Sequence, residues 1–411
     1  MAQVLIVQSN GASVTFSANI TSYGHLGGTL ETGVETTEAN ANTPISVAGI
    51  FSLLYVRVVT NTVTATSTIR LRKNSANGNS AVSIGSSATG EFEDSSGTDA
   101  VAANDLVCFQ RVIGATGTSV VVTVSSIVFS AESNTVNKIG LASSGGSSFS
   151  AASSYLKVNS ISAADPTTES RNQVQVNHNF TWQHLYSYIS ANSRSTTTTI
   201  KSRVNGADGN QSLSITSSST GAFEDTSNTD SVVTNDLIDF LISCAAGTGT
   251  ITLQQVNSEA VSTDSKFTLV NGTSVTPSVN TGTNDDWYAI GGANGRVTTD
   301  ANESHTTAQM NIGATVSNLW IYISNNTLSS ATTLTLRSNS SDTSLSLSIT
   351  ASTTGSFENS SNTVSVAATD SLCIRLTENS VSGQSTLETI SLLFTNTDIT
   401  VSRIMLMGLG T

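Results

Sequence analysis

One short segment of this chain returns twice at nearly constant spacing, and this internal repeat constrains the fold more than any other feature. Gly90–Asp94 (GEFED) returns as Gly221–Asp225 (GAFED) and as Gly355–Asn359 (GSFEN), at offsets of 131 and 134 residues. Without gaps, residues 54–109 and 185–240 are identical at 28 of 56 positions. A repeat of this length is too long for a solenoid unit and has the size of an independent domain. The chain is therefore predicted to be a tandem triplication.

The same two offsets align further residues across the three copies. They align Leu54-Tyr55 with Leu185-Tyr186 and Leu319-Trp320, Arg72 with Arg203 and Arg337, Asp105 with Asp236 and Asp370, and Glu38 with Glu169 and Glu303. We place the domains at residues 1–132, 133–264 and 265–411. The third copy ends in an extra apolar segment, Ile404–Met407, which is expected to add a strand to a sheet or to dock on a partner.

Each copy has the two-residue alternation of β-strands. Leu54, Val56 and Val58 alternate with Tyr55 and Arg57, and turn residues separate the apolar runs. Ser, Thr, Asn and Val dominate while Glu, Lys, Arg and Leu are scarce, which disfavours helices and coiled coils. The predicted fold class is all-β, with three tandem homologous β-sandwich domains. A jelly roll is preferred over an immunoglobulin-like sandwich because the Cys…Trp…Cys pattern is missing.

The excess of acidic over basic residues limits the kinds of partner that this chain can bind. The chain carries 16 basic and 29 acidic residues, a formal net charge of −13. Arg70, Arg72 and Lys73 form the only basic cluster, which is too small to neutralise a phosphate backbone. Residues 1–7 lack the basic region of a secretory signal, and no window holds the roughly 20 apolar residues of a membrane helix. We expect no nucleic-acid partner and no membrane partner.

The repeated G-x-F-E-[DN] motif has two interpretations. In the first, the Gly turns the chain and the Phe fills the core of the sandwich. In the second, the paired carboxylates bind Ca²⁺ together with Asp99 and Asp230. The third copy has Asn359 and Val364 at two of these positions, so the structural interpretation is preferred. No metal ligand and no cofactor-binding residue is assigned.

Two further sets of recurring residues are expected to be structural. Arg72, Arg203 and Arg337 are expected to pair with Glu93, Glu224 and Glu358, as surface ion pairs that each stabilise by less than about 1 kcal/mol. The aromatic positions Tyr55, Tyr186 and Trp320 are expected to form one wall of the core, with sugar-stacking platforms as the alternative.

No constellation in the sequence supports catalysis. Cys108, Cys244 and Cys373 are an odd number and are expected to be buried small hydrophobes rather than a disulfide framework. The four histidines occupy no equivalent positions and no zinc-binding spacing. Nucleophile elbows, phosphate-binding loops and dinucleotide fingerprints are missing. We predict a non-enzymatic protein with no catalytic residues.

The repeats resemble β-sandwich repeats in structural proteins of tailed bacteriophage virions. The resemblance is carried by Leu54–Val58, by the turn Arg72–Asn79 and by Gly90–Asp94. It implies a virion component on the capsid exterior, such as a capsid decoration (cement) protein bound to the major capsid protein or to other virion proteins. The alternative is a glycan-binding fibre or surface adhesin. Three like domains suit either a ring or a line across several subunits, and the divergence of the third copy slightly favours the line.

Overall fold

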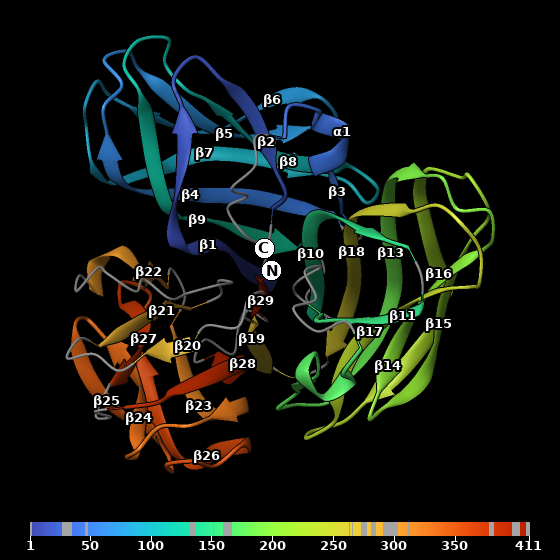
Figure 1. Cartoon of the computed structure of the whole chain (residues 1–411). Helices are drawn as coiled ribbons and strands as arrows, with labels where there is room; N and C mark the ends of the chain where they lie inside the picture. Colours follow the sequence, from blue (N-terminus) through green and yellow to red (C-terminus); the bar gives the residue numbers. More distant parts are fainter. Residues whose placement is uncertain are drawn as a thin grey trace.

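The computed structural model describes most of the chain and confirms the all-β class (Figure 1). The described residues are 2–26, 35–45, 48–131, 137–150, 152–158, 167–262, 264, 266–272, 278–280, 285–290, 303–310, 313–377, 382–396 and 403–407. Helix is limited there to α1 (Glu38–Ala41) and two 3-10 turns, η1 (Glu169–Arg171) and η2 (Glu303–His305). None of these helices is long and apolar enough to cross a membrane.

The first repeat is a jelly roll by its strand pairing. One sheet has the order β1-β9-β4-β7 and the other β2-β8-β5-β6, so the first main strand pairs with the eighth, the second with the seventh, the third with the sixth and the fourth with the fifth. The short β3 (Thr43–Pro44) also pairs with β8. The main strands are β1 (Ala2–Ser17), β2 (Thr21–Gly24), β4 (Gly49–Asn61), β5 (Ser67–Lys73), β6 (Ala76–Ile84), β7 (Gly90–Val101), β8 (Leu106–Val112) and β9 (Ser119–Ala131).

The second and third repeats reproduce these two sheets. Their first sheets have the orders β10-β18-β13-β16 and β19-β28-β23-β26, and their second sheets β11-β17-β14-β15 and β21-β27-β24-β25. The strands of repeat 2 are β10 (Asn137–Phe149), β11 (Ala152–Leu156), β12 (Val174–Gln175), β13 (Phe180–Asn192), β14 (Thr198–Val204), β15 (Ala207–Ile215), β16 (Gly221–Val232), β17 (Leu237–Cys244) and β18 (Ile251–Ser262). Those of repeat 3 are β19 (Lys266–Gly272), β20 (Ser278–Asn280), β21 (Asp286–Ala289), β22 (Ala308–Gln309), β23 (Ala314–Asn326), β24 (Thr332–Ser338), β25 (Ser341–Ile349), β26 (Gly355–Val366), β27 (Ser371–Thr377) and β28 (Gln384–Asn396). The exact domain limits stay a prediction.

The core of each repeat lies between its two sheets. Leu54, Val56 and Val58 on β4 are buried, as are Ile69 and Leu71 on β5. These are the residues that the alternation assigns to one face, and each fully buried aliphatic side chain contributes about 1.5–3 kcal/mol.

The three repeats contact one another head to tail. Thr43 of repeat 1 contacts Gln255 on β18 of repeat 2, Asn177 of repeat 2 contacts Ser391 on β28 of repeat 3, and β21 of repeat 3 lies against β1 of repeat 1. The first sheet of each repeat therefore receives the preceding repeat on its outer face, and the contacts close a ring (Figure 1). The line that the divergence of the third copy favoured is wrong.

The last strand closes this ring. β29 (Arg403–Met407) pairs in parallel with β1, with Leu5 opposite Met405. It also lies close to β10 and β19, so it touches the first strand of every repeat. The apolar segment Ile404–Met407 thus adds a strand to a sheet, and β1 and β29 lie near the centre of the ring (Figure 1).

Candidate functional site

The recurring arginines pair with the glutamates that recur at the same two offsets, Glu38, Glu169 and Glu303. Arg203 Nε and Nη2 donate to the two carboxylate oxygens of Glu169 at 2.8 and 3.1 Å. Arg72 binds Glu38 at 3.0 and 2.8 Å, and Arg337 binds Glu303 at 2.8 and 2.9 Å. Such two-point pairs are both stronger and more directional than single ionic contacts.

The predicted pairing with Glu93, Glu224 and Glu358 is wrong for a topological reason. Arg72 lies on β5 of the second sheet, whereas Glu93 lies on β7 of the first sheet and is exposed. The same separation holds in the other two repeats.

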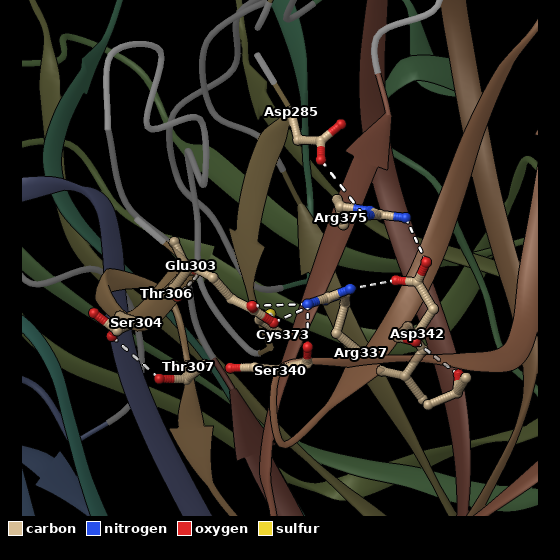
Figure 2. Close-up of polar contacts among 12 residues, drawn as sticks. Asp285, Glu303, Ser304, Thr306, Thr307, Arg337, Ser340, Asp342, Cys373 and Arg375 are labelled. Atoms are coloured by element: carbon tan, nitrogen blue, oxygen red, sulfur yellow. Dashed lines mark hydrogen bonds and ion pairs between the residues drawn. The ribbon is translucent and has the colours of Figure 1, made fainter. Parts of the chain in front are cut away.

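The third copy of this arginine cluster is drawn in Figure 2. Arg337 Nη1 donates to Asp342 at 2.5 Å, and its Nη2 also reaches the Ser340 carbonyl. Burial is the largest single influence and raises the pKa of Glu303, but the hydrogen bonds from Arg337, Cys373 and Ser340, together with the charge of Arg337, leave that pKa lowered. The ring of Trp287 lies 5.3 Å from the guanidinium carbon, a cation–π distance. The carboxylate is therefore held ionised, as a fixed anchor.

In repeats 1 and 2 the anchored glutamate begins a segment that docks on the next repeat. Glu169 opens η1, and the residues after it reach repeat 3: Arg171 Nε donates to Glu388 Oε1 at 2.7 Å, and Asn177 Nδ2 donates to the Asn318 carbonyl at 3.2 Å. We call residues 38–45 and 169–177 the docking segments. The recurring arginine therefore positions the contact between repeats.

The contact between repeats 2 and 3 also contains a buried ion pair. Lys157 Nζ lies 3.2 Å from Glu388 Oε2, and both side chains are at most 3% exposed. Ser324 donates to the other carboxylate oxygen at 2.6 Å. Burial lowers the pKa of Lys157, although Glu388 acts in the opposite direction. At the equivalent positions the sequence has Leu26 in repeat 1 and Gln254 in repeat 2, so the ion pair distinguishes this interface from the one before it.

A buried acid beside the Arg203–Glu169 pair is not predicted from the sequence. Asp239 of repeat 2 occupies the position of Cys108 and Cys373, and it is fully buried. In the other repeats the thiols lie beside the anchor, with Cys108 Sγ 3.9 Å from Glu38 and Cys373 Sγ 3.3 Å from Glu303. Burial and the nearby Glu169 raise the pKa of Asp239 well above its ordinary value. The 131-residue offset was the signal that could have found it.

The aromatic residues proposed as sugar platforms are covered. Tyr55, Tyr186 and Trp320 are 3%, 8% and 2% exposed, so no sugar ring can stack on them. Tyr322, on the same face of β23 as Trp320, contacts Ser170 of repeat 2. The platform interpretation is wrong, and at least in repeat 3 this face of the first sheet belongs to the contact between domains.

The Asp of the repeated motif joins the two sheets. Asp94 on β7 accepts hydrogen bonds from the backbone N–H groups of Ala81 on β6 (2.9 Å), Ser96 (3.1 Å) and Gly97 (2.8 Å). In repeat 3, Asn359 accepts from two N–H groups in the same way and donates Nδ2 to the Ser346 carbonyl. The amide of repeat 3 thus bonds the carbonyl oxygen of Ser346, whereas the acid of repeat 1 bonds the N–H group of the equivalent Ala81.

The second acid considered for calcium has a similar role. Asp99 accepts from the N–H groups of Asn79 (2.6 Å) and Ser80 (2.9 Å). Repeat 3 has Val364 at this position, and the residue equivalent to Ser80 is the fully buried Leu345. The polar pair of Asp99 and Ser80 in repeat 1 is thus replaced in repeat 3 by the apolar pair of Val364 and Leu345. Among the described residues, no group of three His, Cys, Asp or Glu side chains is placed to hold a metal ion.

Replacing Asp94 tests this sheet-to-sheet link. We expect Asp94→Ala to lower the free energy of unfolding by about 2 kcal/mol, because three backbone N–H groups lose their acceptor. Asp94→Asn should cost about 1 kcal/mol, because its amide oxygen can still accept from the N–H groups of Ser96 and Gly97 and only the Ala81 N–H loses its acceptor. Scanning calorimetry measures both, with Glu93→Ala as the matched exposed control. Equal losses for Asp94→Ala and Glu93→Ala would contradict the assigned role.

The cysteines are buried thiols, as the sequence predicts. Cys108, Cys244 and Cys373 are free and buried. Burial raises the pKa of Cys108 to about 12, so the reactive thiolate is not formed at neutral pH. Two histidines are also buried: burial lowers the pKa of His25 to about 3 and that of His178 to about 4. Both imidazoles are therefore neutral at physiological pH.

No protein-family model and no curated protein matches the chain. Several solved structures do match, among them two from archaeal viruses. One is described as the triple jelly-roll fold and turret assembly of an archaeal virus; it is 14% identical, the alignment covers 98% of each chain, and the TM-score is 0.18. The other, of Sulfolobus turreted icosahedral virus, is 13% identical over 96% of this chain and 95% of that chain, also at a TM-score of 0.18. At that score the chains do not superpose as whole bodies, so the jelly-roll assignment depends on the strand pairing of this chain.

Proposed function

We propose that this chain is a non-enzymatic structural component of a virus particle that decorates and cements the exterior of a capsid. The observation that carries the proposal is the closed ring of three jelly rolls, joined by head-to-tail contacts within one chain. Such a ring imitates a trimer and can contact a partner surface at three like points. The resemblance of the repeats to tailed-phage structural proteins supports the viral setting.

A cement protein needs a rigid body, and the arginine–glutamate pairs and the docking segments help to make the ring rigid. The Arg203–Glu169 pair fixes the start of the docking segment within repeat 2, and Arg171 and Lys157 of that repeat bind Glu388 of repeat 3. These contacts hold the ring together. In this proposal the partners are the major capsid protein or other virion proteins, and the ring adds rigidity to the shell.

Immunogold labelling of particles from the source culture, with an antibody to the whole chain, tests the proposal. We expect gold spread evenly over the capsids, and a lower temperature of genome release once the protein has been stripped off. Gold confined to tail tips or to cell surfaces would discard the cement role. Stripped capsids as stable as intact ones would discard it too.

A further inference from the structure

The hairpin of β5 and β6 places an Asn-Gly pair beside the recurring arginine of repeat 1. Arg72 Nη1 donates to Asn77 Oδ1 at 2.5 Å, and the Asn77 side chain is exposed. The equivalent positions of repeats 2 and 3 hold Asp208 and Asp342, and each of these accepts from the recurring arginine of its own repeat. Repeat 1 therefore has an amide where the other two repeats have a carboxylate.

In repeats 2 and 3 this carboxylate also binds a second cation. Lys201 Nζ lies 2.6 Å from Asp208 Oδ2, and Arg375 Nη2 donates to Asp342 Oδ2 at 2.5 Å (Figure 2). The hydrogen bond from Lys201 is the main reason that the pKa of Asp208 is lowered, and Arg203 adds to the effect. The position thus favours a negative charge between two cations.

Repeat 1 has both cations and lacks the carboxylate. Arg70 occupies the position of Lys201, and it shares a face of β5 with Arg72 because strand residues two apart point to the same side. Arg70 Nε is buried without a hydrogen-bond partner, and no carboxylate of the described residues forms an ion pair with Arg70. Asn77 has one acceptor oxygen, which Arg72 uses, and its Nδ2 group only donates. The amide therefore cannot do what the acid does in the other repeats.

The glycine after Asn77 is required by the fold. A Cβ at Gly78 would lie 2.7 Å from Asp99 Oδ2, so no side chain fits there. Repeat 3 has Val364 in place of this acid, and there Thr343 replaces the glycine. The close approach of Asp99 thus explains the glycine, which leaves the backbone nitrogen of Gly78 without a side chain to shield it.

We propose that Asn77 is converted to aspartate in the folded chain by deamidation, which supplies the missing carboxylate between Arg70 and Arg72. The backbone nitrogen of Gly78 attacks the side-chain amide carbon of Asn77 and forms a C–N bond. The bond from that carbon to the amide nitrogen breaks, and ammonia leaves with the proton of the Gly78 N–H. Water then opens the cyclic imide: its oxygen bonds the side-chain carbon, one proton returns to the Gly78 nitrogen, and the new acid ionises.

The surroundings of Asn77 favour both the attack and this product. The guanidinium of Arg72 already donates to Oδ1, where negative charge develops when the Gly78 nitrogen attacks. Opening the imide at the main-chain carbonyl would give isoaspartate and insert a methylene group into β6. That would disturb the pairing of Arg72 with position 77, so the folded hairpin favours ordinary aspartate.

The chain contains a matched Asn-Gly pair in the opposite environment. Asn205, which Gly206 follows, donates Nδ2 to Asp236 Oδ1 at 2.7 Å and accepts from the Leu237 N–H at 2.9 Å. A carboxylate at position 205 would lose the donor and stand against the charge of Asp236. The same two-residue sequence thus lies beside cations in repeat 1 and beside an acid in repeat 2, and the fold predicts that only Asn77 converts readily.

Peptide mapping by tandem mass spectrometry tests the proposal on the purified full chain during incubation at pH 8. We expect position 77 to become aspartate several-fold faster than position 205. In urea, where the fold no longer distinguishes the two pairs, both should convert at similar rates. Conversion in the folded chain that is no faster at 77 than at 205, or as much isoaspartate at 77 as in urea, would overturn the proposal.

Three variants test the part played by the cations. Arg70→Gln should slow the conversion at position 77 several-fold, whereas Lys201→Gln, at the equivalent place in repeat 2, should leave it unchanged. Asn77→Asp should have a higher midpoint of thermal unfolding than freshly purified wild-type chain and should match the incubated one. An unchanged rate in Arg70→Gln, or an Asn77→Asp chain less stable than fresh wild type, would show that the position does not favour the carboxylate and would refute the proposal.

Discussion

Replacing Glu388 by alanine is expected to cause the largest loss of stability of any single change at the contacts between domains. Glu388 is 2% exposed and binds Lys157 and Arg171 of repeat 2. Without it, the buried ammonium of Lys157 has lost its carboxylate. Removing one partner of a buried ion pair typically costs about 3–5 kcal/mol. Urea unfolding followed by tryptophan fluorescence and circular dichroism measures the loss, together with any separate transition as repeat 3 detaches.

The chain supplies a matched control for this experiment. Gln254 occupies the position of Glu388 in repeat 2 and donates to Ser190 at 3.0 Å, as Ser324 donates to Glu388. Gln254→Ala should therefore cost no more than about 1 kcal/mol. The double variant Lys157→Met/Glu388→Gln should recover much of the stability, because both charges leave the interface together. A loss below about 1 kcal/mol for Glu388→Ala would show that the ion pair is not needed.

Which arginine pairs with which acid could not be inferred from proximity in the sequence. Glu93 is only 21 residues from Arg72, but the two lie on different sheets, while Glu38, 34 residues before Arg72, lies beside it. Strand alternation reveals which residues are buried, and it does not reveal which sheet a strand joins. The recurrence of Glu38 at both offsets was the useful signal, since an anchor kept in three copies must recur with its arginine.

The divergence of the third copy predicts the wrong arrangement of the domains, a line in place of the ring. The divergence of the third copy, at Asn359 and Val364, lies on β26 at the outer edge of the sandwich. There it alters a link between the two sheets of one domain, so it carries no information about contacts between domains. The differences that do, Lys157 and Glu388, lie far apart in the sequence and meet only when repeat 2 docks on repeat 3. The alternation of apolar and polar residues, by contrast, depends only on residues close together in the sequence, and it predicts the all-β fold correctly.

The second large effect is a gain in stability when Asp239 is replaced. A carboxyl group whose pKa is raised in the folded state contributes stability that is fully present below its ordinary value of 3.8 and is lost as the pH rises through the folded pKa. At neutral pH the wild-type chain therefore bears the cost of Asp239 next to Glu169, which Arg203 offsets only in part. We expect Asp239→Asn to raise the free energy of unfolding at pH 8 by about 1–3 kcal/mol, the range for a buried polar group without a full set of partners.

The stability gained by Asp239→Asn should increase as the pH rises. At pH 4 the Asp239 carboxyl is protonated in the folded chain, so Asp239→Asn should change stability little, and the difference should grow toward pH 8. Asp239→Cys, which restores the residue of repeats 1 and 3, should show the same trend, whereas Glu224→Gln at an exposed position of the same repeat should not. Urea unfolding at pH 4, 6 and 8 provides the comparison. A variant that is less stable than wild type at pH 8, or a difference that does not vary with pH, would mean that Asp239 is ionised and fully compensated by Arg203. In that case Asp239, which stands in place of the cysteine of the other two repeats, would not lower the stability of the chain.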